Sequence, residues 1–165
     1  MLKRMRDMNN EPMVVMDTAA MLMGLSKRTL WRYLREGQLS SLPKDSKGRG
    51  MVLIREIAGR LLVRLNPGNG DPELDDYALL AQADRGDGAA QTGLALLLLQ
   101  QEQYALALHW LEQAATQGYA DAMHHLAGLY QAGVGVERCP NTALAWRSKA
   151  AALGHPIARE QLASL

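Results

Sequence analysis

The second half of the sequence repeats itself, and this repetition constrains the fold more than any other feature of the chain. Ala-Leu-His-Trp at residues 107–110 returns as Ala-Leu-Ala-Trp at residues 143–146, and residues 114–118 return in similar form at residues 150–154. Both offsets are 36 residues. A period of this length is typical of helical repeats that stack side by side, each burying the apolar face of its neighbour.

A second set of positions follows the same pattern with one gap. Its members are an alanine and a leucine four residues apart, at Ala90 and Leu94, Ala122 and Leu126, and Ala158 and Leu162. The first interval is 32 residues and the second 36, because residues 133–136 have no counterpart in the earlier unit. Each unit predicts two antiparallel helices, with alanines where the helix axes approach closely and a glycine just past a helix end. Trp110 and Trp146 occupy equivalent positions and are predicted in the core.

Over about residues 72–165 the sequence closely resembles the Sel-one-like repeat family, relatives of the tetratricopeptide repeats. The matching stretch is Ala-Met-His-His-Leu-Ala-Gly-Leu-Tyr-Gln-Ala-Gly-Val-Gly-Val at 122–136, continued by 143–146 and by Lys-Ala-Ala-Ala-Leu-Gly-His at 149–155. Ala127 stands where the family usually has glycine, and the preceding unit has lost its loop. The resemblance implies a surface that binds protein as an adaptor or scaffold, rather than catalysis.

The charge of the chain changes sign near residue 66. Residues 1–66 hold 13 Lys and Arg against 6 Asp and Glu, whereas residues 67–165 hold 5 against 11. Asn-Pro-Gly-Asn-Gly-Asp-Pro at 66–72, a run that interrupts helices and strands, lies at the same point. We therefore predict a flexible leader at 1–14, a basic domain at 15–66, a linker at 67–72 and the repeat domain at 73–165.

Two short helices joined by a glycine-containing turn are predicted in the basic domain. Asp17 is expected to cap the first helix, to residue 23, and Ser26 the second, over residues 27–36. In the second helix Leu30 and Leu34 face inward, and four cations and a tryptophan take the other side. This is the helix-turn-helix pattern, in which the cationic face of the second helix enters the major groove of DNA.

A small β-hairpin is predicted next. Its strands are expected around residues 39–43 and 51–54, on either side of the polar, glycine-containing tip 44–50. A final amphipathic helix is predicted at about residues 55–65, with inward-facing side chains at Ile57, Leu61, Leu62 and Leu65. The predicted fold is mostly α: a small winged helix-turn-helix with a two-stranded β-hairpin, followed by an α-helical repeat solenoid.

Residues 16–65 resemble the winged helix-turn-helix of the MerR and excisionase type. The resemblance rests on Thr-Ala-Ala at 18–20, Gly-Leu-Ser-Lys-Arg-Thr-Leu-Trp-Arg-Tyr at 24–33 and Glu-Gly-Gln-Leu at 36–39. It implies that the second helix contacts the major groove and the hairpin wing contacts the DNA backbone. Together with the cationic face, it predicts the following DNA-binding residues: Ser26, Lys27, Arg28, Thr29, Trp31, Arg32, Arg35, Lys44, Lys47 and Arg49.

Several side chains allow more than one interpretation. Trp31 either packs on a sugar-phosphate strand or lies against the final helix of its own domain. The histidines and Cys139 allow a metal site, but no ligand pair has the spacing of a known motif, so surface or inter-helix histidines are favoured and neither metal nor cofactor is predicted. An acidic group is interpreted as solubilising, or as a shield for the basic domain: Asp71, Glu73, Asp75, Asp76, Asp84 and Asp87.

Two functions remain open from the sequence. The first is a sequence-specific transcriptional regulator that binds double-stranded DNA and uses its repeats to form a homodimer or to bind a partner protein. The second is a protein adaptor whose winged domain does not bind DNA. An enzyme is not predicted, because no nucleophile–base pair, phosphate-binding loop or carboxylate pair is present. A lone cysteine and the lack of any membrane-length apolar run favour the cytoplasm.

Overall fold

The computed structural model describes residues 11–40, 44–67 and 75–164. The chain divides into two compact units, Met1–Arg85 and Gly86–Leu165, which are described separately below. The division follows helix α5 (Asp76–Asp84), which the sequence assigns to the repeat domain. The boundary between the units thus differs from the one drawn at residues 67–72.

Unit 1, Met1–Arg85, is built on a two-stranded antiparallel sheet. Strand β1 (Met13–Val15) pairs with β2 (Met51–Leu53), and Val14 lies opposite Val52. The chain passes directly from β1 into α2 (Met16–Met23), and from there into α3 (Lys27–Arg35). The largest fully buried side chains of this unit come from both strands and from the helices: Val14, Leu22, Leu30, Val52, Leu53, Ile54, Ile57 and Leu80.

The predicted hairpin is corrected by this pairing. Strand β2 lies where it was predicted, but among the described residues its partner is β1, a segment placed partly in the leader. Residues 41–43 lie outside the described residues, and Leu39 is buried without belonging to a strand. The choice of β1 as the partner strand has a physical reason. Val14 and Val15 are β-branched and buried, and β-branched residues favour strands, whereas a proline cannot donate a ladder hydrogen bond.

The predicted helix at 55–65 is also corrected. The structure has only a short helix, α4 (Ile54–Ile57), followed by a 3-10 turn, η1 (Ala58–Arg60). Leu61 is extended, and the backbone N–H of Leu62 donates to the carbonyl of Leu22 in α2, at 2.8 Å. The chain leaves the helix to make this bond, and the Leu62 side chain, predicted to face inward, is exposed.

Of the two capping residues predicted for the helix-turn-helix, one is confirmed and the other is wrong. Ser26 caps α3 as predicted, because its hydroxyl accepts the backbone N–H of Thr29 at 3.1 Å. Asp17 does not cap α2: the capping position is Val15, which has no side-chain acceptor, and Asp17 lies in the first turn. A carboxylate there still interacts favourably with the helix dipole.

Helix α5 is fixed at its start by its own carboxylates. Asp75 accepts the backbone N–H groups of Tyr77 and Ala78, and Asp76 accepts the N–H of Asn66 at 2.7 Å. The N–H of Asp76 in turn donates to the carbonyl of Asn66, and Pro67 forms a bridge with Asp75. The two ends of the predicted linker are therefore held together; most of that linker lies outside the described residues.

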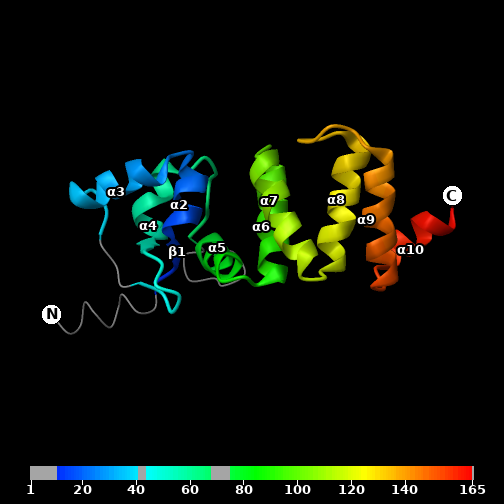
Figure 1. Ribbon diagram of the computed structural model, residues 1–165, viewed down its shortest axis with the longest axis horizontal. Coiled ribbons are helices and arrows are strands. Elements are labelled where there is room, and N and C mark those ends of the chain that lie inside the picture. The colour runs from blue at the N-terminus through cyan, green and yellow to red at the C-terminus, as the bar shows by residue number, and fades with distance from the viewer. Residues whose placement is uncertain (1–10, 41–43, 68–74, 165) are drawn as a thin grey trace. The chain divides into compact units, whose positions relative to one another are not determined.

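Unit 2, Gly86–Leu165, is a row of helices in which each packs on the next (Figure 1). They are α6 (Gly88–Gln100), α7 (Tyr104–Thr116), α8 (Ala120–Ala132), α9 (Pro140–Ala152) and α10 (Pro156–Ala163). The closest pairs are α6 with α7 and α8 with α9, which are the two helices of each predicted unit. The predicted fold class, mostly α with a two-stranded sheet and a helical solenoid, is confirmed.

The repeated positions form the core of this solenoid. Ala114 and its equivalent Ala150 are fully buried, and so are Leu94 and Leu126. Trp110 is 3% exposed, which confirms its predicted place in the core. Trp146 is only half-buried and lies under the Lys149 ammonium group, 4.4 Å from the ring centroid, so the prediction holds for one tryptophan only.

The extra residues 133–136 form a loop that covers the start of α7. Gly135 has a φ of +70°, and a Cβ built on it would lie 2.5 Å from Cβ of Tyr104 and 3.3 Å from Cδ1 of Leu108. Only a glycine allows both the left-handed backbone and this close approach. The loop thus joins the second repeat to the first.

Candidate functional site

The predicted recognition helix, α3, is amphipathic in the structure. Leu30 is fully buried, whereas the opposite face exposes Trp31 to 58% together with four cations: Lys27, Arg28, Arg32 and Arg35. The Ser26 cap holds the start of the helix and involves Thr29 through both its backbone N–H and its hydroxyl, 3.0 Å from the Ser26 hydroxyl. The hydroxyls of Ser26 and Thr29, predicted to bind DNA, are therefore partners in the cap.

Acidic neighbours touch two of the four cations of α3. The Lys27 ammonium lies 2.7 Å from the carboxylate of Asp17, and the Arg32 guanidinium lies 3.9 Å from that of Glu36. All four of these side chains are about half exposed or more, so both pairs are weak in water. A polyanion can displace such pairs at little cost, and the face as a whole remains cationic.

Trp31 is largely exposed. At 58% exposure, at most a part of its ring packs against its own domain. The arginines of this region approach a different ring, since Arg32 and Arg60 lie 5.7 and 5.2 Å from the centroid of Tyr33. Trp31 is thus a large apolar side chain surrounded by cations and open to solvent.

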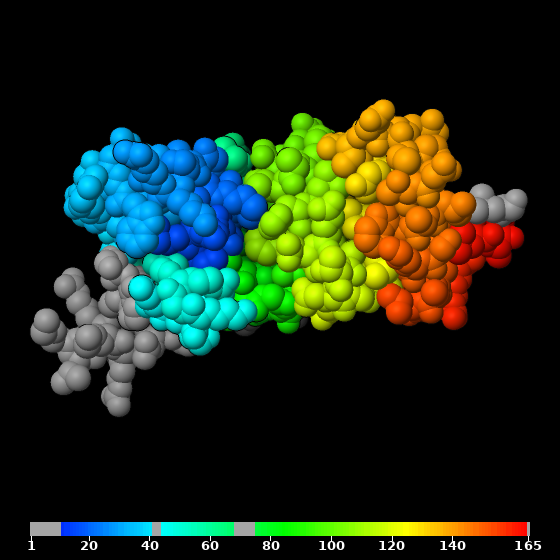
Figure 2. Space-filling view, viewed as in Figure 1, coloured from blue at the N-terminus to red at the C-terminus, as the bar shows by residue number. Residues whose placement is uncertain are grey.

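The turn at residues 44–50 is organised around Asp45. Its carboxylate accepts the backbone N–H groups of Lys47 and Arg49, at 3.0 and 2.7 Å, and Nε of the Arg49 side chain, at 2.7 Å. Burial opposes ionisation of Asp45, but these bonds outweigh it and hold the pKa of Asp45 below its usual value. Lys44 and Lys47 are exposed, whereas the guanidinium of Arg49 is already paired. In the space-filling view the turn (cyan) lies beside the surface of α2 and α3 (blue) (Figure 2).

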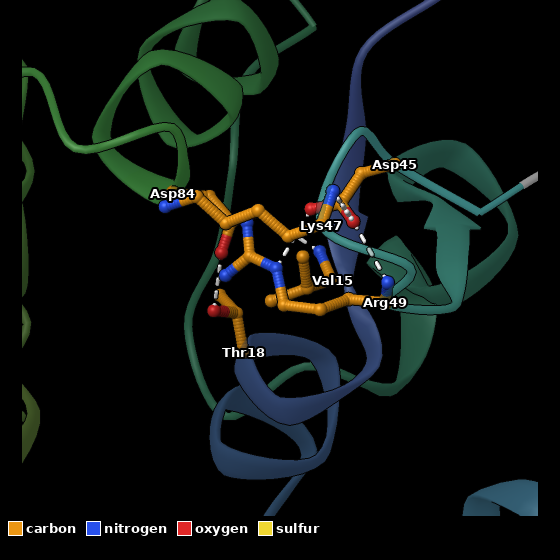
Figure 3. Close-up of polar contacts among 6 residues, drawn as sticks. All are labelled: Val15, Thr18, Asp45, Lys47, Arg49 and Asp84. Carbon is orange, nitrogen blue, oxygen red and sulfur yellow. Dashed lines mark hydrogen bonds and ion pairs between the residues drawn. The ribbon is translucent and has the colours of Figure 1, made fainter.

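Asp84, at the end of α5, lies near Val15 and Thr18, and close to the turn that holds Arg49 (Figure 3). Its carboxylate accepts the backbone N–H of Val15 at 2.8 Å and the hydroxyl of Thr18. Burial raises the pKa of Asp84, against the two hydrogen bonds and the positive charge of Arg49. An open groove of about 270 Å³ lies nearby between the sheet and α5, lined by Pro12, Met13, Met51, Ala78, Ala81 and other residues.

Sequence reasoning missed the structural role of four carboxylates in the predicted acidic group, of which Asp76 is described above. Asp84 fastens α5, Asp75 caps α5, and Asp87 caps α6 by accepting the N–H of Ala90 at 2.8 Å. Asp71 and Glu73 lie outside the described residues. A signal was present for the caps, because Asp75 and Asp87 directly precede helical segments. No sequence signal names Val15 and Thr18 as partners of Asp84.

Within the part of the chain that the structure describes, no three His, Cys, Asp or Glu side chains lie close enough together to hold a metal ion. Cys139 is a free thiol ahead of α9. A search of the same residues for a helix long and apolar enough to cross a membrane finds none. The arrangement offers two surfaces for binding: the cationic face of α3 and the repeat helices of unit 2.

Comparisons with known proteins bear on the repeats. The fold is similar to the crystal structure of a Sel1 repeat protein from Oxalobacter formigenes, with 31% sequence identity and a TM-score of 0.51. The match covers 56% of this chain but only 28% of the solved one, so the chain spans well under a third of that protein's length. No protein-family model and no curated protein matches the sequence. The likeness supports the Sel1-like resemblance of the repeats; none of these comparisons supports the resemblance to MerR proteins.

Proposed function

We propose that this chain is a non-enzymatic scaffold that binds another protein through its Sel1-like repeats. The observation that carries the proposal is the regular pairing of α6 with α7 and of α8 with α9, together with the 31% identity to a Sel1 repeat protein. Stacked helical repeats present an extended surface. The exposed side chains of this surface do not take part in the core, and such surfaces bind partner proteins.

The test is crosslinking of the full chain in its own cells. A photoreactive amino acid replaces one exposed repeat residue at a time, such as His109 or Gln113 on α7, or Gln131 on α8. A scaffold gives a discrete crosslinked partner at some of these positions and not at others. A matched control adds Leu126→Asp, which places a charge at a fully buried core position and should unfold unit 2. The proposal fails if no repeat position yields a partner, or if the partner survives the Leu126→Asp change.

A second candidate function is DNA binding by α3, and the exposed Trp31 within four cations is the observation that favours it. Arginine and lysine neutralise phosphates, and arginine can also bind guanine with two hydrogen bonds. With DNA bound, the repeats would connect a DNA site with a protein partner or with a second copy of the chain. Lys44 and Lys47 are the exposed cations of the turn that can reach a phosphate, whereas Arg49 must first leave Asp45.

This candidate is tested by recovering and sequencing host DNA fragments that stay bound to the purified protein at near-physiological salt. The variant Arg28→Ala/Arg32→Ala is compared with Arg55→Ala/Arg85→Ala, which removes the same charge from outside α3. Enriched sites that are lost only in the first variant would support sequence-specific binding, with a cost of about 1–3 kcal/mol for each bidentate contact. Equal retention by both variants, or none by the unaltered chain, would leave the scaffold function alone.

A further inference from the structure

Three histidines gather where α8, α9 and α10 meet. His124 and His125 belong to α8, and His155 is the residue before α10. The rings of His124 and His155 are stacked, with centroids 4.4 Å apart and planes at 19°. His125 meets His124 edge to face, with centroids 5.7 Å apart. These rings form part of the contact between the second repeat and the helix that follows it.

The imidazole of His155 caps the start of α10. Its Nδ1 accepts the backbone N–H of Ala158 at 3.2 Å. Its Nε2 faces the carboxylate of Asp121 on α8, at 3.4 Å, and the side chain is only 8% exposed. A proton on Nδ1 would remove the acceptor that caps α10, because a protonated ring has only donors.

The surroundings of His124 disfavour a positive charge. Its Nδ1 is buried and has no hydrogen-bond partner among the described residues, and the same is true of Nε of Arg147 on α9. Arg147 stands at the position that Leu111 holds in the preceding repeat, so a cation replaces an apolar residue here. Burial lowers the pKa of His124, and His155, His125 and Arg147 lower it further, against the single carboxylate of Asp121. Burial also lowers the pKa of His125.

The lowered pKa values of His124 and His125 make the packing of α10 depend on pH. A histidine that is fully exposed to water takes up its proton near pH 6.5, whereas His124 and His125 resist protonation while α10 is packed on α8 and α9. The packed arrangement is therefore stabilised above about pH 6.5 and loses this stability as the pH falls below that value. Protonation of His124 and His125 would place two positive charges on neighbouring rings, close to Arg147.

We propose that this histidine cluster is a pH-sensitive catch that holds α10 on α8 and α9 at neutral pH and releases it in mild acid. Helix α10 is attached to α9 through the N–H of His155 on the carbonyl of Ala150 and through Nε of Arg159 on that of Ala151. Release would uncover the face of α9 around Ala150 and Ala151, the counterpart of the α7 face around Ala114 and Ala115, which is buried in unit 2. The inference does not depend on the proposed scaffold function.

The experiment measures amide hydrogen exchange of the full chain at about pH 7.5 and about pH 5, expressed as protection factors so that the intrinsic effect of pH is removed. We expect the α10 amides, Ala158 among them, to lose protection by about tenfold for each unit by which the histidine pKa values are lowered. The amides of α6 and α7 act as the internal reference and should keep their protection.

Two variants identify the groups responsible. His124→Thr introduces the residue that the preceding repeat has at this position, Thr92, and His155→Asn keeps an oxygen that can cap α10 while it removes the ring. Both should make the protection of α10 less dependent on pH. His109→Gln, which removes an exposed histidine from α7, should leave the dependence unchanged. The proposal is overturned if α10 is equally protected at both pH values, or if it loses protection equally in the His124→Thr and His155→Asn variants.

Discussion

A single carboxylate, that of Asp84, fastens a helix to a strand and to another helix in unit 1. The backbone N–H of Val15 points away from the partner strand β2 and would be an unsatisfied donor without Asp84, since Val15 is buried. The hydroxyl of Thr18 supplies the second bond. A buried polar group that loses its partner costs more than an average hydrogen bond gains, so the position is sensitive to substitution.

We predict that Asp84→Ala destabilises unit 1 by about 1–3 kcal/mol, because the Val15 N–H is left without an acceptor. Asp84→Asn keeps one acceptor oxygen and should cost less. The measurement is native-state hydrogen exchange of the β1 and α2 amides, which follows this unit separately from the repeats. Equal and negligible effects of both substitutions would show that the carboxylate does not support the strand.

The raised pKa of Asp84 predicts a pH dependence for the same unit. The folded unit binds the proton more tightly than the unfolded chain does, so the contribution of Asp84 to stability is largest below its unfolded pKa and is lost as the pH rises through the folded pKa. The stability difference between the unaltered chain and Asp84→Asn should therefore shrink with rising pH. A difference that grows with pH would contradict the assignment of burial as the dominant cause.

Among the elements, the loop 133–136 distinguishes the second repeat from the first. The first repeat connects its helices by a short turn in which Glu102 has a φ of +58°. The second inserts four residues, and the insertion contacts Tyr104 and Leu108 of the preceding helix α7. The inserted residues thus add contact between the repeats.

We predict that Gly135→Ala destabilises unit 2 more than Gly118→Ala does. Both glycines have positive φ, so both alanines incur the cost of a left-handed conformation, about 1–2 kcal/mol. At Gly118 no other atom lies within 4 Å of the added Cβ, whereas at Gly135 it meets Tyr104. This collision should add about 1–3 kcal/mol. Chemical denaturation of the two variants gives the comparison, and equal losses would mean that the loop does not rest on α7.

At the scale of the whole molecule, the boundary between the two units lies after Arg85 and not at the predicted linker. Helix α5 continues the sequence pattern of the repeats, since Ala83 to Gly86 match residues 115–118 in part, yet it belongs to unit 1. Asp84 ties its end to β1 and α2, and Asp76 ties its start to Asn66. The helix thus completes the basic domain.

We predict that a fragment ending after Arg85 is more stable than one ending after Asn66. The shorter fragment loses the acceptor for Val15 and leaves the sheet side of the groove, with Met13 and Met51, uncovered. Thermal unfolding followed by circular dichroism should show the higher Tm for residues 1–85. The same Tm for both fragments would place the boundary at the predicted linker instead.

The sequence predicts the features that depend on local or periodic patterns. The solenoid follows from alanines and leucines at fixed offsets, and α3 follows from the Ser26 cap and from Leu30 opposite a cationic face. The strand pair does not, because β1 has only three residues and its partner lies far along the chain. The partners of the site residues do not either: the pairing of Arg49 with Asp45 and the position of Asp84 depend on how loops and helices pack.

The repetition of one segment in both helix pairs also bears on how such a chain can change its length. The segments 114–118 and 150–154 occupy equivalent places, each at the end of one helix pair. A gene duplication with breakpoints at these two places would insert one whole helix pair, and each new junction would bring together residues that already pack in this way. Recombination can thus lengthen or shorten unit 2 without altering unit 1, so the number of repeats can evolve separately from the basic domain.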